Sequence, residues 1–593
     1  MGWNIAERKS GETSMKSVMR KVKNAVQIYR DYGAHSFIKR LENKRYHQRP
    51  GLRTVQAVHM VSEEELEAQK RRKFEKDIKF SIITPLYNTP RNFLIELLDS
   101  MEKQTYGNWE LCLADGSDEE HAYVGKICQK RAEQDSRIVY YSLPENKGIS
   151  ENTNACLQLA TGDYFGLLDH DDLLHPSALY EVMKAIEETG AEFLYTDEVK
   201  FSGKIEEIQD PLMFNLKPGF GKDDLRSHNY ICHFTVFHKK LLEGEQDFYR
   251  KECDGSQDHD MVLRLTEKTT RITHIPKVLY YWRVHDNSVS KDLGTKLYAV
   301  DSAIRAIDQQ LLRTGDTGKA ASNLPFQTIY RITYELKQEF TVSLILHGTE
   351  KPEELEACIR NLEENTEYRN LELIYFAERE LKIKVRDGMS LQRIPLDTSK
   401  TKAESWDQAV ELATGEMMLL FDARCRPIEK NWIKEMVMFS QREDVCAVGP
   451  KIYYEDDRIA YAGIALDRES KTGLRLLCEH DTRADIGYEA LLCHVRETTG
   501  VSAACMMFSK KIWREVQGFA NACKGYEDID FCLRGLEKGK NNVWTCFSEL
   551  RFTGQEFIEE KKEEERNRFV TVWNQQFGQE QCYHPLWKIL RIV

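Results

Sequence analysis

The chain has 593 residues, which is too long for one ordinary hydrophobic core, so its length predicts two to four domains. With 41% hydrophobic and 30% charged residues, and only 14 Pro and 33 Gly, its composition excludes disordered, collagen-like and low-complexity proteins. No apolar run reaches the roughly 18–20 residues of a membrane-spanning helix. The first residues lack the apolar core of a secretory signal, so we expect a cytoplasmic location.

Charge is distributed unevenly. The net charge is −12, yet residues 1–60 carry 13 Lys/Arg against 4 Asp/Glu, which leaves 71 basic and 92 acidic residues in the remainder. A globular body of that sign repels phosphate backbones, so nucleic acid is excluded as the main ligand.

The basic segment predicts an amphipathic helix, because apolar residues recur from Val18 to Tyr29 at helical spacing among Lys and Arg, with Gly33 as its stop. Two interpretations stay open. The helix lies on an anionic membrane, which would give residues 1–60 peripheral contact at the inner face of the cell membrane, or it packs on the body with its basic face in water. The stretch from Ser62 to Lys79, which lacks Gly and Pro, predicts a helical lead-in to the first domain.

The pattern changes at Phe80, where FSIITPL predicts a strand before a Pro/Asn turn. Apolar residues between Phe93 and Met101 then recur at helical spacing, and two further β-rich runs follow, of which WELCLAD ends at Asp115. Strands that alternate with helices indicate a mostly parallel α/β sheet.

The same order recurs about 260 residues later, from Phe340. ATGD at Ala160 matches ATGE at Ala413, and QDHDMVLR at Gln257 matches EDIDFCLR at Glu527. This repeat predicts two tandem domains. The expected divisions are a basic helical extension at 1–77, a first domain at 78–310, a linker at 311–338, a second domain at 339–560 and a C-terminal tail at 561–593.

Three carboxylates, Asp169, Asp171 and Asp172, follow one apolar strand of the first repeat in GLLDHDDLLHP. In a parallel α/β sheet this strand end faces the ligand crevice, where hard oxygen ligands suit Mg²⁺ or Mn²⁺ bridging a diphosphate. A helix cap would explain Asp172 alone.

Further along, GSQDHD places Asp258 and Asp260 at the start of a predicted helix. A helix N-terminus favours ionised carboxylates, the state that a general base needs, although a cap explains one of the two equally well. HIPKVLYYWRVH then brings Arg283 and His285 after an aromatic strand. A lone His carries no ligand assignment by itself.

Taken together and in this order, TPLYN, LADGSD, NKGISENTNACLQLATGDYFGLLDHDD, GSQDHDMVLR and YYWRVH resemble the inverting glycosyltransferases of family 2. The second repeat resembles the same family through AYAGIAL, SAACMMFSKKIWREVQGF and GYEDIDFCLRGLEKG. The resemblance implies an α/β fold of two tandem A-type glycosyltransferase domains, each with a mostly parallel central sheet flanked by helices, behind an N-terminal helical extension. Tandem proteins of this layout look like bacterial enzymes of cell-surface polysaccharide assembly, rhamnan and O-antigen synthesis among them.

The resemblance also implies roles for single residues. Asp258 would be the catalytic base, and Asp169, Asp171 and His285 would hold Mn²⁺ or Mg²⁺. Asp115 would bind a pyrimidine base, so the implied donor is a UDP- or dTDP-sugar, with a glycan or lipid-linked acceptor. The residues implied around the nucleotide sugar are Thr84, Pro85, Tyr87, Asn88, Asp115, Asn146, Lys147, Gly148, Asp169, His170 and Asp171.

The second repeat departs from the family pattern where the chemistry would occur. Its strand ends FDARCRP, so Asp422 remains while Arg424 and Arg426 stand where a second carboxylate is expected, and the ligand His is replaced near Arg551. Arginine repels a divalent cation. The second domain is therefore read as non-catalytic, holding acceptor glycan or the partner domain, or else as a metal-independent transferase whose arginines replace the cation.

The leading hypothesis is a metal-dependent, inverting sugar transfer from a nucleotide-sugar donor in cell-surface polysaccharide biosynthesis, with one active site in residues 78–310. One alternative is a non-catalytic carbohydrate-binding or scaffolding subunit of a polysaccharide assembly complex, against which the intact carboxylates of the first repeat argue. Another is a nucleotidyltransferase, which would carry a Gly-rich phosphate loop near its first strand, and TPLYNTP has none.

Overall fold

The computed structural model describes residues 50–285, 297–323, 325–479, 481–519 and 523–590, with a few isolated positions between 26 and 41. The basic amphipathic helix expected between Val18 and Gly33 therefore lies mostly outside the described residues. In the described part of the chain, no helix is both long and apolar enough to cross a membrane.

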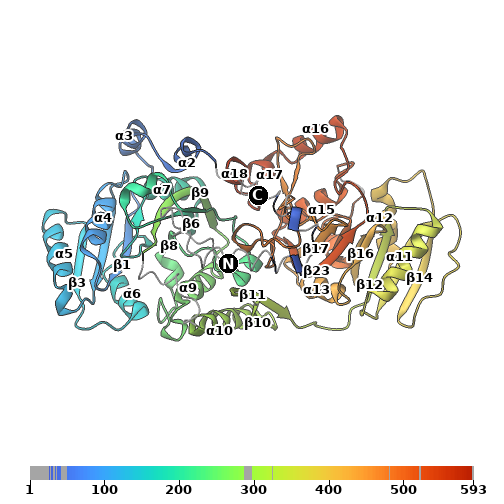
Figure 1. The fold of residues 1–593 in the computed structure, drawn as a ribbon, viewed down its shortest axis with the longest axis horizontal. Coiled ribbons are helices and arrows are strands. Elements are labelled where there is room, and N and C mark those ends of the chain that lie inside the picture. The colour runs from blue at the N-terminus through green and yellow to red at the C-terminus, as the bar shows by residue number, and fades with distance from the viewer. Residues whose placement is uncertain are drawn as a thin grey trace.

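Two α/β units make up the body of the protein and lie towards opposite ends of its long axis (Figure 1). The strands of the first unit are β1 (Phe80–Leu86), β2 (Trp109–Asp115), β3 (Ile138–Ser142), β4 (Tyr164–Leu167), β5 (Leu173–Leu174), β6 (Phe193–Phe201), β7 (Met213–Asn215), β8 (Thr235–His238) and β9 (Ile272–Arg283). Its helices are α4 (Arg91–Glu102), α5 (Tyr123–Gln134), α6 (Ile149–Leu157), α7 (Ala178–Thr189), α8 (Lys222–Ser227), α9 (Gln257–Thr266) and α10 (Leu297–Thr314).

The second unit has corresponding elements. Its main strands are β12 (Val342–His347), β13 (Leu371–Ala377), β14 (Met389–Pro395), β15 (Met417–Asp422), β16 (Cys425–Pro427), β17 (Val445–Tyr454), β22 (Cys505–Ser509) and β23 (Asn541–Phe552). Shorter strands are β18 (Ile459–Tyr461), β19 (Ile464–Leu466), β20 (Leu474–Leu476) and β21 (Arg496–Glu497). Its helices are α11 (Pro352–Glu364), α12 (Lys402–Leu412), α13 (Trp432–Ser440), α14 (Lys510–Glu515) and α15 (Glu527–Glu537).

The two sheets have the same topology. The first has the strand order β3-β2-β1-β4-β8-β6-β9-β5, and the second β14-β13-β12-β15-β22-β17-β23-β16, so each strand in one order has a counterpart in the other. The predicted α/β fold with two tandem sheet domains is thereby confirmed.

Parallel strands at the centre of each sheet bring their carboxyl ends to one edge. β1 runs parallel to β2, with Leu86 opposite Asp115, and parallel to β4, with Ile83 opposite Leu167. In the second unit, β12 pairs in the same way with β13 and β15. The loops that follow these strands therefore meet, as in other open α/β sheets that bind ligands.

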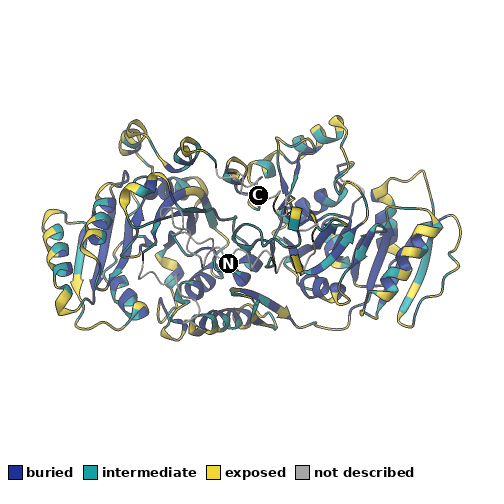
Figure 2. Cartoon of the chain, viewed as in Figure 1, coloured by how far each residue is buried: buried dark blue, intermediate teal, exposed yellow. Residues whose placement is uncertain are grey.

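The central strands are buried on both faces, which explains their nearly continuous apolar sequences. Every residue of β2 is buried, as are all but one of β1. Helix α4 buries Leu94, Leu97, Leu98 and Met101 in the same hydrophobic cluster as these strands. Figure 2 shows the result as buried sheet centres with exposed outer faces on the flanking helices.

One polar network recurs in both units and explains the repeated ATG strings. The Ser81 hydroxyl donates to buried Glu110 at 2.6 Å and accepts the Gly162 N–H at 2.8 Å. Ser343 makes the same pair of bonds in the second unit, accepting the Gly415 N–H at 3.0 Å. A Cβ at either glycine would lie 2.6 Å from the serine Oγ, so only glycine fits there. These repeated residues therefore serve the fold.

Helices α2 (Leu52–His59) and α3 (Glu63–Arg71) precede the first sheet. Ser62 caps α3 by accepting the Glu65 N–H at 3.2 Å, and three glutamates in its first turn complement the helix dipole. The predicted helical lead-in is thus confirmed as far as Arg71.

The segment expected as a linker forms a hairpin of β10 (Gly318–Asn323) and β11 (Phe326–Tyr334), which lies between the two units (Figure 1). The Tyr334 hydroxyl accepts from Arg226 of the first unit at 2.8 Å and from Arg442 of the second at 3.1 Å. Arg442 also pairs with Asp223 of the first unit at 2.6 Å, and both side chains are buried. Because buried charges need partners, this network fastens the two units together.

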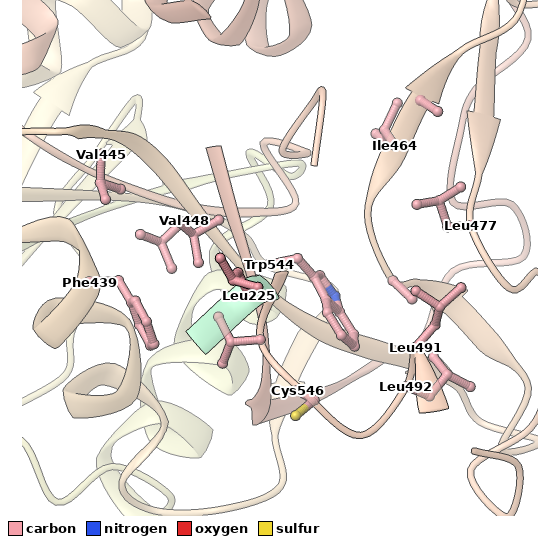
Figure 3. Packing of buried hydrophobic residues seen from close by; sticks show 14 of the residues in the cluster. Leu225, Phe439, Val445, Val448, Ile464, Leu477, Leu491, Leu492, Trp544 and Cys546 are labelled. Atoms are coloured by element: carbon pink, nitrogen blue, oxygen red, sulfur yellow. The ribbon is translucent and has the colours of Figure 1, made fainter. Parts of the chain in front are cut away.

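Hydrophobic packing continues across the same boundary. Leu225 of α8 belongs to the same buried cluster as Phe439, Val448 and Trp544 of the second unit (Figure 3). The two units therefore share part of one core.

The C-terminal segment also bridges the units. It contains α16 (Glu563–Val572), α17 (Asn574–Gly578) and α18 (Pro585–Ile589). The Glu580 carboxylate accepts the Leu466 N–H of the second unit at 2.7 Å, and the Gln581 carbonyl accepts the Gly219 N–H of the first at 2.7 Å.

His584, just before α18, is fully buried against Asp197 of β6, with 2.7 Å between Nε2 and Oδ2. The His584 Nδ1 accepts the Leu586 N–H, so the ring proton lies on Nε2 and is donated to Asp197. His274 lies 2.9 Å from the other carboxylate oxygen. Burial acts to raise the pKa of Asp197, but the contacts with the two histidines hold that pKa well below its usual range.

Replacing His584 by Ala is expected to lower the free energy of unfolding by about 2–3 kcal/mol, because one oxygen of a buried carboxylate loses its donor. Urea unfolding at pH 7 measures this change. Lys588→Ala, at an exposed position on α18, is the control and is expected to stay within about 0.5 kcal/mol of the wild type. Equal stability of the two variants would contradict the bridging role of His584.

Candidate active site

The residues expected to form the active site gather at the carboxyl edge of the first sheet. β1 and β2 end together at Leu86 and Asp115, and Asp169 follows the end of β4 by two residues. The topology therefore brings the three loops to one place.

Asn88 joins the loops after β1 and β2. Its backbone N–H donates to the Ser117 hydroxyl at 2.9 Å and its Nδ2 to Asp118 at 2.8 Å, from a left-handed conformation (φ 50°) that Asn tolerates. The other predicted residues of this turn are Thr84, fully buried within β1, Pro85, half-buried, and Tyr87, 47% exposed. Thr84 thus belongs to the core of the strand, whereas Pro85 is partly and Tyr87 largely open to solvent.

Asp115 is 6% exposed and its carboxylate is held by two donors. The Ser117 N–H donates to Oδ1 at 2.9 Å, and the Tyr140 hydroxyl donates to Oδ2 at 3.0 Å. Burial, and then the charge of Asp115, raise the pKa of Tyr140, which keeps the phenol as a donor. The carboxylate is therefore fixed in orientation at the strand end.

The NKG turn forms the start of α6. The Asn146 side-chain oxygen accepts the Gly148 N–H at 3.0 Å and the Asn152 amide at 2.7 Å. Gly148 has φ +96°, which a residue with a side chain rarely adopts. Lys147 is exposed, with its Nζ 3.4 Å from Glu145.

Asp172 is a structural residue at the centre of the DHDD turn. It is 1% exposed and accepts the Tyr280 hydroxyl and the Arg283 N–H, each at 2.7 Å. Its interpretation as a helix cap is wrong, because α7 begins only at Ala178. Burial, followed by the charges of the neighbouring aspartates, raises the pKa of Asp172. This carboxyl fastens the turn to β9.

Arg283 holds the same turn from the other side, and sequence analysis gave it no role. Its guanidinium is fully buried and donates to the Asp171 carbonyl at 2.7 Å and to Glu96 at 2.6 Å. It lies 4.2 Å from the ring centre of Phe93 and 4.8 Å from that of Phe201. The backbone at Asp171 is therefore fixed by a desolvated arginine.

The structure pairs Asp171 with His285, with 2.8 Å between Oδ2 and Nε2. Burial acts to raise the pKa of Asp171, but the hydrogen bond with His285 and the nearby His170 bring that pKa below its ordinary value. The His170 ring in turn lies 2.6 Å from the Thr89 hydroxyl. Two of the predicted metal ligands are thus in direct contact.

Asp169 has a different neighbour. It is 54% exposed, and its Oδ2 lies 3.3 Å from Nε2 of His233. Asp169, Asp172 and His233 form a group whose potential ligand atoms all lie within 4.8 Å of one another, whereas Asp169, Asp171 and His285 are not found as such a group among the described residues.

Two of the predicted residues, Asp171 and His285, are nevertheless spaced as ligands of one divalent cation would be. Neighbouring ligands of a six-coordinate Mg²⁺ at about 2.0–2.1 Å lie about 2.9 Å apart, close to the 2.8 Å between Asp171 and His285. Both side chains are partly exposed, as is Asp169, so the site is open to a ligand. Two carboxylates and an imidazole are donors that Mn²⁺ accepts.

A buried charge network, which the sequence did not indicate, lies behind Asp169. The His233 Nδ1 is 3.3 Å from Glu198 of β6, which is fully buried and pairs with buried Lys217 at 3.2 Å. Burial acts to raise the pKa of Glu198, but Lys217 and then His233 lower that pKa to about 2. His233 also stacks on Tyr280 at 4.9 Å. Two features of the sequence could have indicated this network: the acidic residue Glu198 within the apolar run of β6, and His233 in NYICH.

The two aspartates at the start of α9 differ sharply. Asp260 is fully buried, pairs with Arg250, and lies 2.9 Å from Arg264, so it serves the fold. Asp258 is partly exposed and accepts one hydrogen bond, from Asn229 at 3.0 Å. Of the two, only Asp258 has a carboxylate available to a substrate.

The charges of Asp258 and Asp169 both act on the pKa of the buried Tyr249 side chain. Burial raises the pKa of Tyr249, and the charges of Asp258 and Asp169 raise it further.

The second unit keeps the edge of the sheet and Asp422, but it has Arg424 where the first unit has Asp171. Arg424 binds Asp422 through two bonds, at 3.0 Å and 2.7 Å. Arg426 donates instead to the backbone carbonyls of Ala423 and Cys425. Both arginines therefore have partners within their own turn.

Strand register locates the counterpart of His285. The register pairs are Leu173 with Tyr281 in the first sheet and Arg426 with Arg551 in the second. His285 comes four residues after Tyr281, so its counterpart is Gln555, four residues after Arg551. The expected replacement near Arg551 is thereby assigned to Gln555.

Residues 81–244 match the family model described as Glycosyl transferase family 2. The first unit is therefore a Glycosyl transferase family 2 domain, and the family resemblance of the sequence is confirmed.

The chain is 32% identical over 494 residues to the uncharacterized protein y4gI of Sinorhizobium fredii, which covers 81% of this chain and 53% of that protein. It is 28% identical over 485 residues to the O-antigen biosynthesis protein RfbC of Myxococcus xanthus, which covers 79% and 37%. The chain thus spans about half or less of these relatives. Of the solved structures, S. aureus TarS 1–349 in complex with UDP-GlcNAc is similar with 18% identity and a TM-score of 0.33, covering 40% of this chain and 67% of that one.

Proposed function

We propose that this chain is a metal-dependent, inverting glycosyltransferase with one active site in residues 78–310. It transfers a sugar from a nucleotide-sugar donor to a glycan or lipid-linked acceptor in cell-surface polysaccharide biosynthesis. The observation that carries the proposal is the contrast at the start of α9, where Asp260 is buried and paired with two arginines whereas Asp258 is partly exposed and oriented by one hydrogen bond from Asn229. The similarity to an O-antigen biosynthesis protein supports the biosynthetic context.

In this proposal Asp258 acts on the acceptor. Its carboxylate, oriented by Asn229, takes the proton from an acceptor hydroxyl while that oxygen attacks the anomeric carbon. The attack comes from the face opposite the departing nucleotide, so one displacement inverts the configuration. Because the Asp260 carboxylate is paired with Arg250 and Arg264, the role of the base is assigned to Asp258 and not to Asp260.

The donor site is assigned to the sheet edge around Asp115 and the DHDD turn. A divalent cation held there by Asp171 and His285, with Asp169 beside them, would supply positive charge for the leaving diphosphate. Arg283 fixes the backbone at Asp171, and Asp115 offers an oriented carboxylate to the base of the nucleotide. UDP- or dTDP-sugars are the proposed donors.

A nucleotide-release assay tests the proposal. The full chain is incubated with Mn²⁺ and a panel of UDP-, dTDP- and GDP-sugars, and release of the nucleoside diphosphate is measured. We expect release from at least one pyrimidine-nucleotide sugar above the rate without protein. A scaffolding subunit would instead bind glycan without nucleotide release on any member of the panel. Contact of residues 1–60 with an anionic membrane is a separate proposal that rests on charge alone.

A further inference from the structure

A cavity of about 90 Å³ lies in the second unit, at the position that the candidate active site takes in the first. Asp422 and Asp528 line it, and these residues correspond to Asp169 and Asp258. The proposed transfer reaction makes no use of this cavity, so the class of ligand that it could bind has to be inferred from the residues that line it.

The lining does not fit a metal. The counterparts of the three proposed cation ligands are Asp422, Arg424 and Gln555, of which only Asp422 is a carboxylate. Both its oxygens already bind Arg424. Burial acts to raise the pKa of Asp422, but Arg424 brings that pKa below its ordinary value, so the two groups form an ion pair. A divalent cation would have to displace the arginine and leave it unpaired.

The charges do not suit a diphosphate either. Four carboxylates and three cationic groups line the cavity. The carboxylates are those of Asp422, Glu527, Asp528 and Glu559, and the cationic groups belong to Lys402, Arg424 and Lys561. Arg424 is held by Asp422 and stacks on Phe552 at 4.9 Å, and Arg426 donates to backbone carbonyls. The arginines that could have replaced a cation are therefore already occupied, and the excess of negative charge opposes phosphate.

The same lining suits hydroxyl groups. The Asp528 carboxylate accepts the N–H groups of Ala503 at 2.7 Å and Ile529 at 2.9 Å, which fixes its orientation and leaves lone pairs for further donors. Lys561 donates to the Gly525 carbonyl at 2.5 Å and has two more hydrogens to offer. The cavity thus offers both donors and acceptors, as a polyhydroxylated ligand requires.

Apolar surface completes the lining. Phe557 and Phe552 lie edge to face at 5.3 Å, and Phe557 also stacks on Tyr461 at 5.5 Å, so the Phe557 ring is held in place. An aromatic ring beside polar groups matches the apolar face and polar rim of a pyranose. The volume is several times the roughly 10–15 Å³ that one ordered water needs, which favours a single sugar ring over a nucleoside diphosphate sugar.

We propose that this cavity binds one uncharged sugar residue of a glycan, without metal, nucleotide or turnover. The second unit would thereby anchor the acceptor glycan while the first unit transfers sugar. The choice of a glycan rests on the proposed function, whereas the exclusion of metal and phosphate rests on the residues that line the cavity.

Saturation-transfer NMR on the full chain in EDTA tests this proposal, with the methyl glycosides of glucose, galactose, N-acetylglucosamine and rhamnose as probes and the anionic methyl glucuronide for comparison. We expect at least one neutral glycoside to bind and the glucuronide not to bind. Phe557→Ala and Lys561→Ala should each raise the dissociation constant about tenfold, by loss of a ring contact and of a donor. Lys538→Ala, an exposed lysine on the same unit, is the matched control and should bind as the wild type does.

Three other results would overturn the inference. Binding that weakens in Asp258→Asn but not in Phe557→Ala or Lys561→Ala would place the sugar in the first unit. Binding of a UDP-sugar in EDTA that depends on Lys561 would assign a metal-independent donor site. Binding of none of the neutral glycosides would exclude a sugar site of this kind. None of these results bears on nucleotide release by the first unit, so the failure of this inference is distinct from a failure of the proposed function.

Discussion

Replacing Asp258 by Asn is expected to reduce sugar transfer by about 10²–10⁴-fold, because the acceptor hydroxyl loses its proton acceptor. The Asn229 amide can still donate to the remaining side-chain oxygen, so the fold should be retained. Steady-state transfer rates measure the effect. Glu252→Gln, which removes an exposed carboxylate close in sequence, is the control and should leave the rate unchanged.

The affinity for nucleotide distinguishes two roles of Asp258, a base that acts on the acceptor and a residue that binds the nucleotide-sugar donor. A base acts on the acceptor, so Asp258→Asn should bind nucleoside diphosphate with the affinity of the wild type in a calorimetric titration. A parallel loss of nucleotide affinity would instead move Asp258 to the donor site, and the proposed direction of attack would have to be revised.

Replacing Asp171 by Ala is expected to abolish nucleotide release to below about 1% of the wild-type rate. The reason is that Asp171 and His285 form the close pair of donors to which the cation is assigned. Chelation with EDTA should have the same effect on the wild type and should be reversed by Mn²⁺. Asp163→Asn, at the opposite end of β4, provides an exposed carboxylate as control.

Full activity of EDTA-treated protein would contradict this assignment. It would show that the contact between Asp171 and His285 is a structural hydrogen bond and that the diphosphate is neutralised by other groups. Activity that survives in Asp171→Ala but still needs Mn²⁺ would instead favour the group of Asp169, Asp172 and His233 as the cation site.

The tandem fold could be predicted because its signals are local. Strands such as β2 are buried along their whole length and therefore read as apolar runs. The ATG strings stood out because Gly162 and Gly415 tolerate no Cβ next to Ser81 and Ser343. Each of these constraints, burial of a strand or the lack of space for a Cβ, fixes the residue type at a single position, so the same residue types persist in both copies of a diverged repeat.

The parts of the site that escaped prediction depend on tertiary contacts. The structural role of Asp172 could not be predicted, because its partners, Tyr280 and the Arg283 N–H, lie more than a hundred residues away in the chain. The pair of Glu198 and His233 likewise comes from different strands and loops. No spacing rule connects residues that meet only when a sheet closes around them.

In the second unit, some features could be predicted from the sequence and others could not. The sequence alone indicated that Arg424 disfavours a cation, and the ion pair with Asp422 agrees with that electrostatic argument. The counterpart of His285 could be predicted only as near Arg551, because an alignment by motif lacks the register that pairs Arg426 with Arg551. The cavity around Asp528 could not be foreseen, since packing decides whether a site is open or filled.

The anomeric configuration of the first transferred product tests the central claim most directly. The full chain is supplied with Mn²⁺, the donor that releases nucleotide and a glycan acceptor, and the anomeric configuration of the new linkage is read by proton NMR. A single displacement assisted by Asp258 predicts a configuration opposite to that of the donor. A product with the configuration of the donor would require a second displacement and would contradict the account.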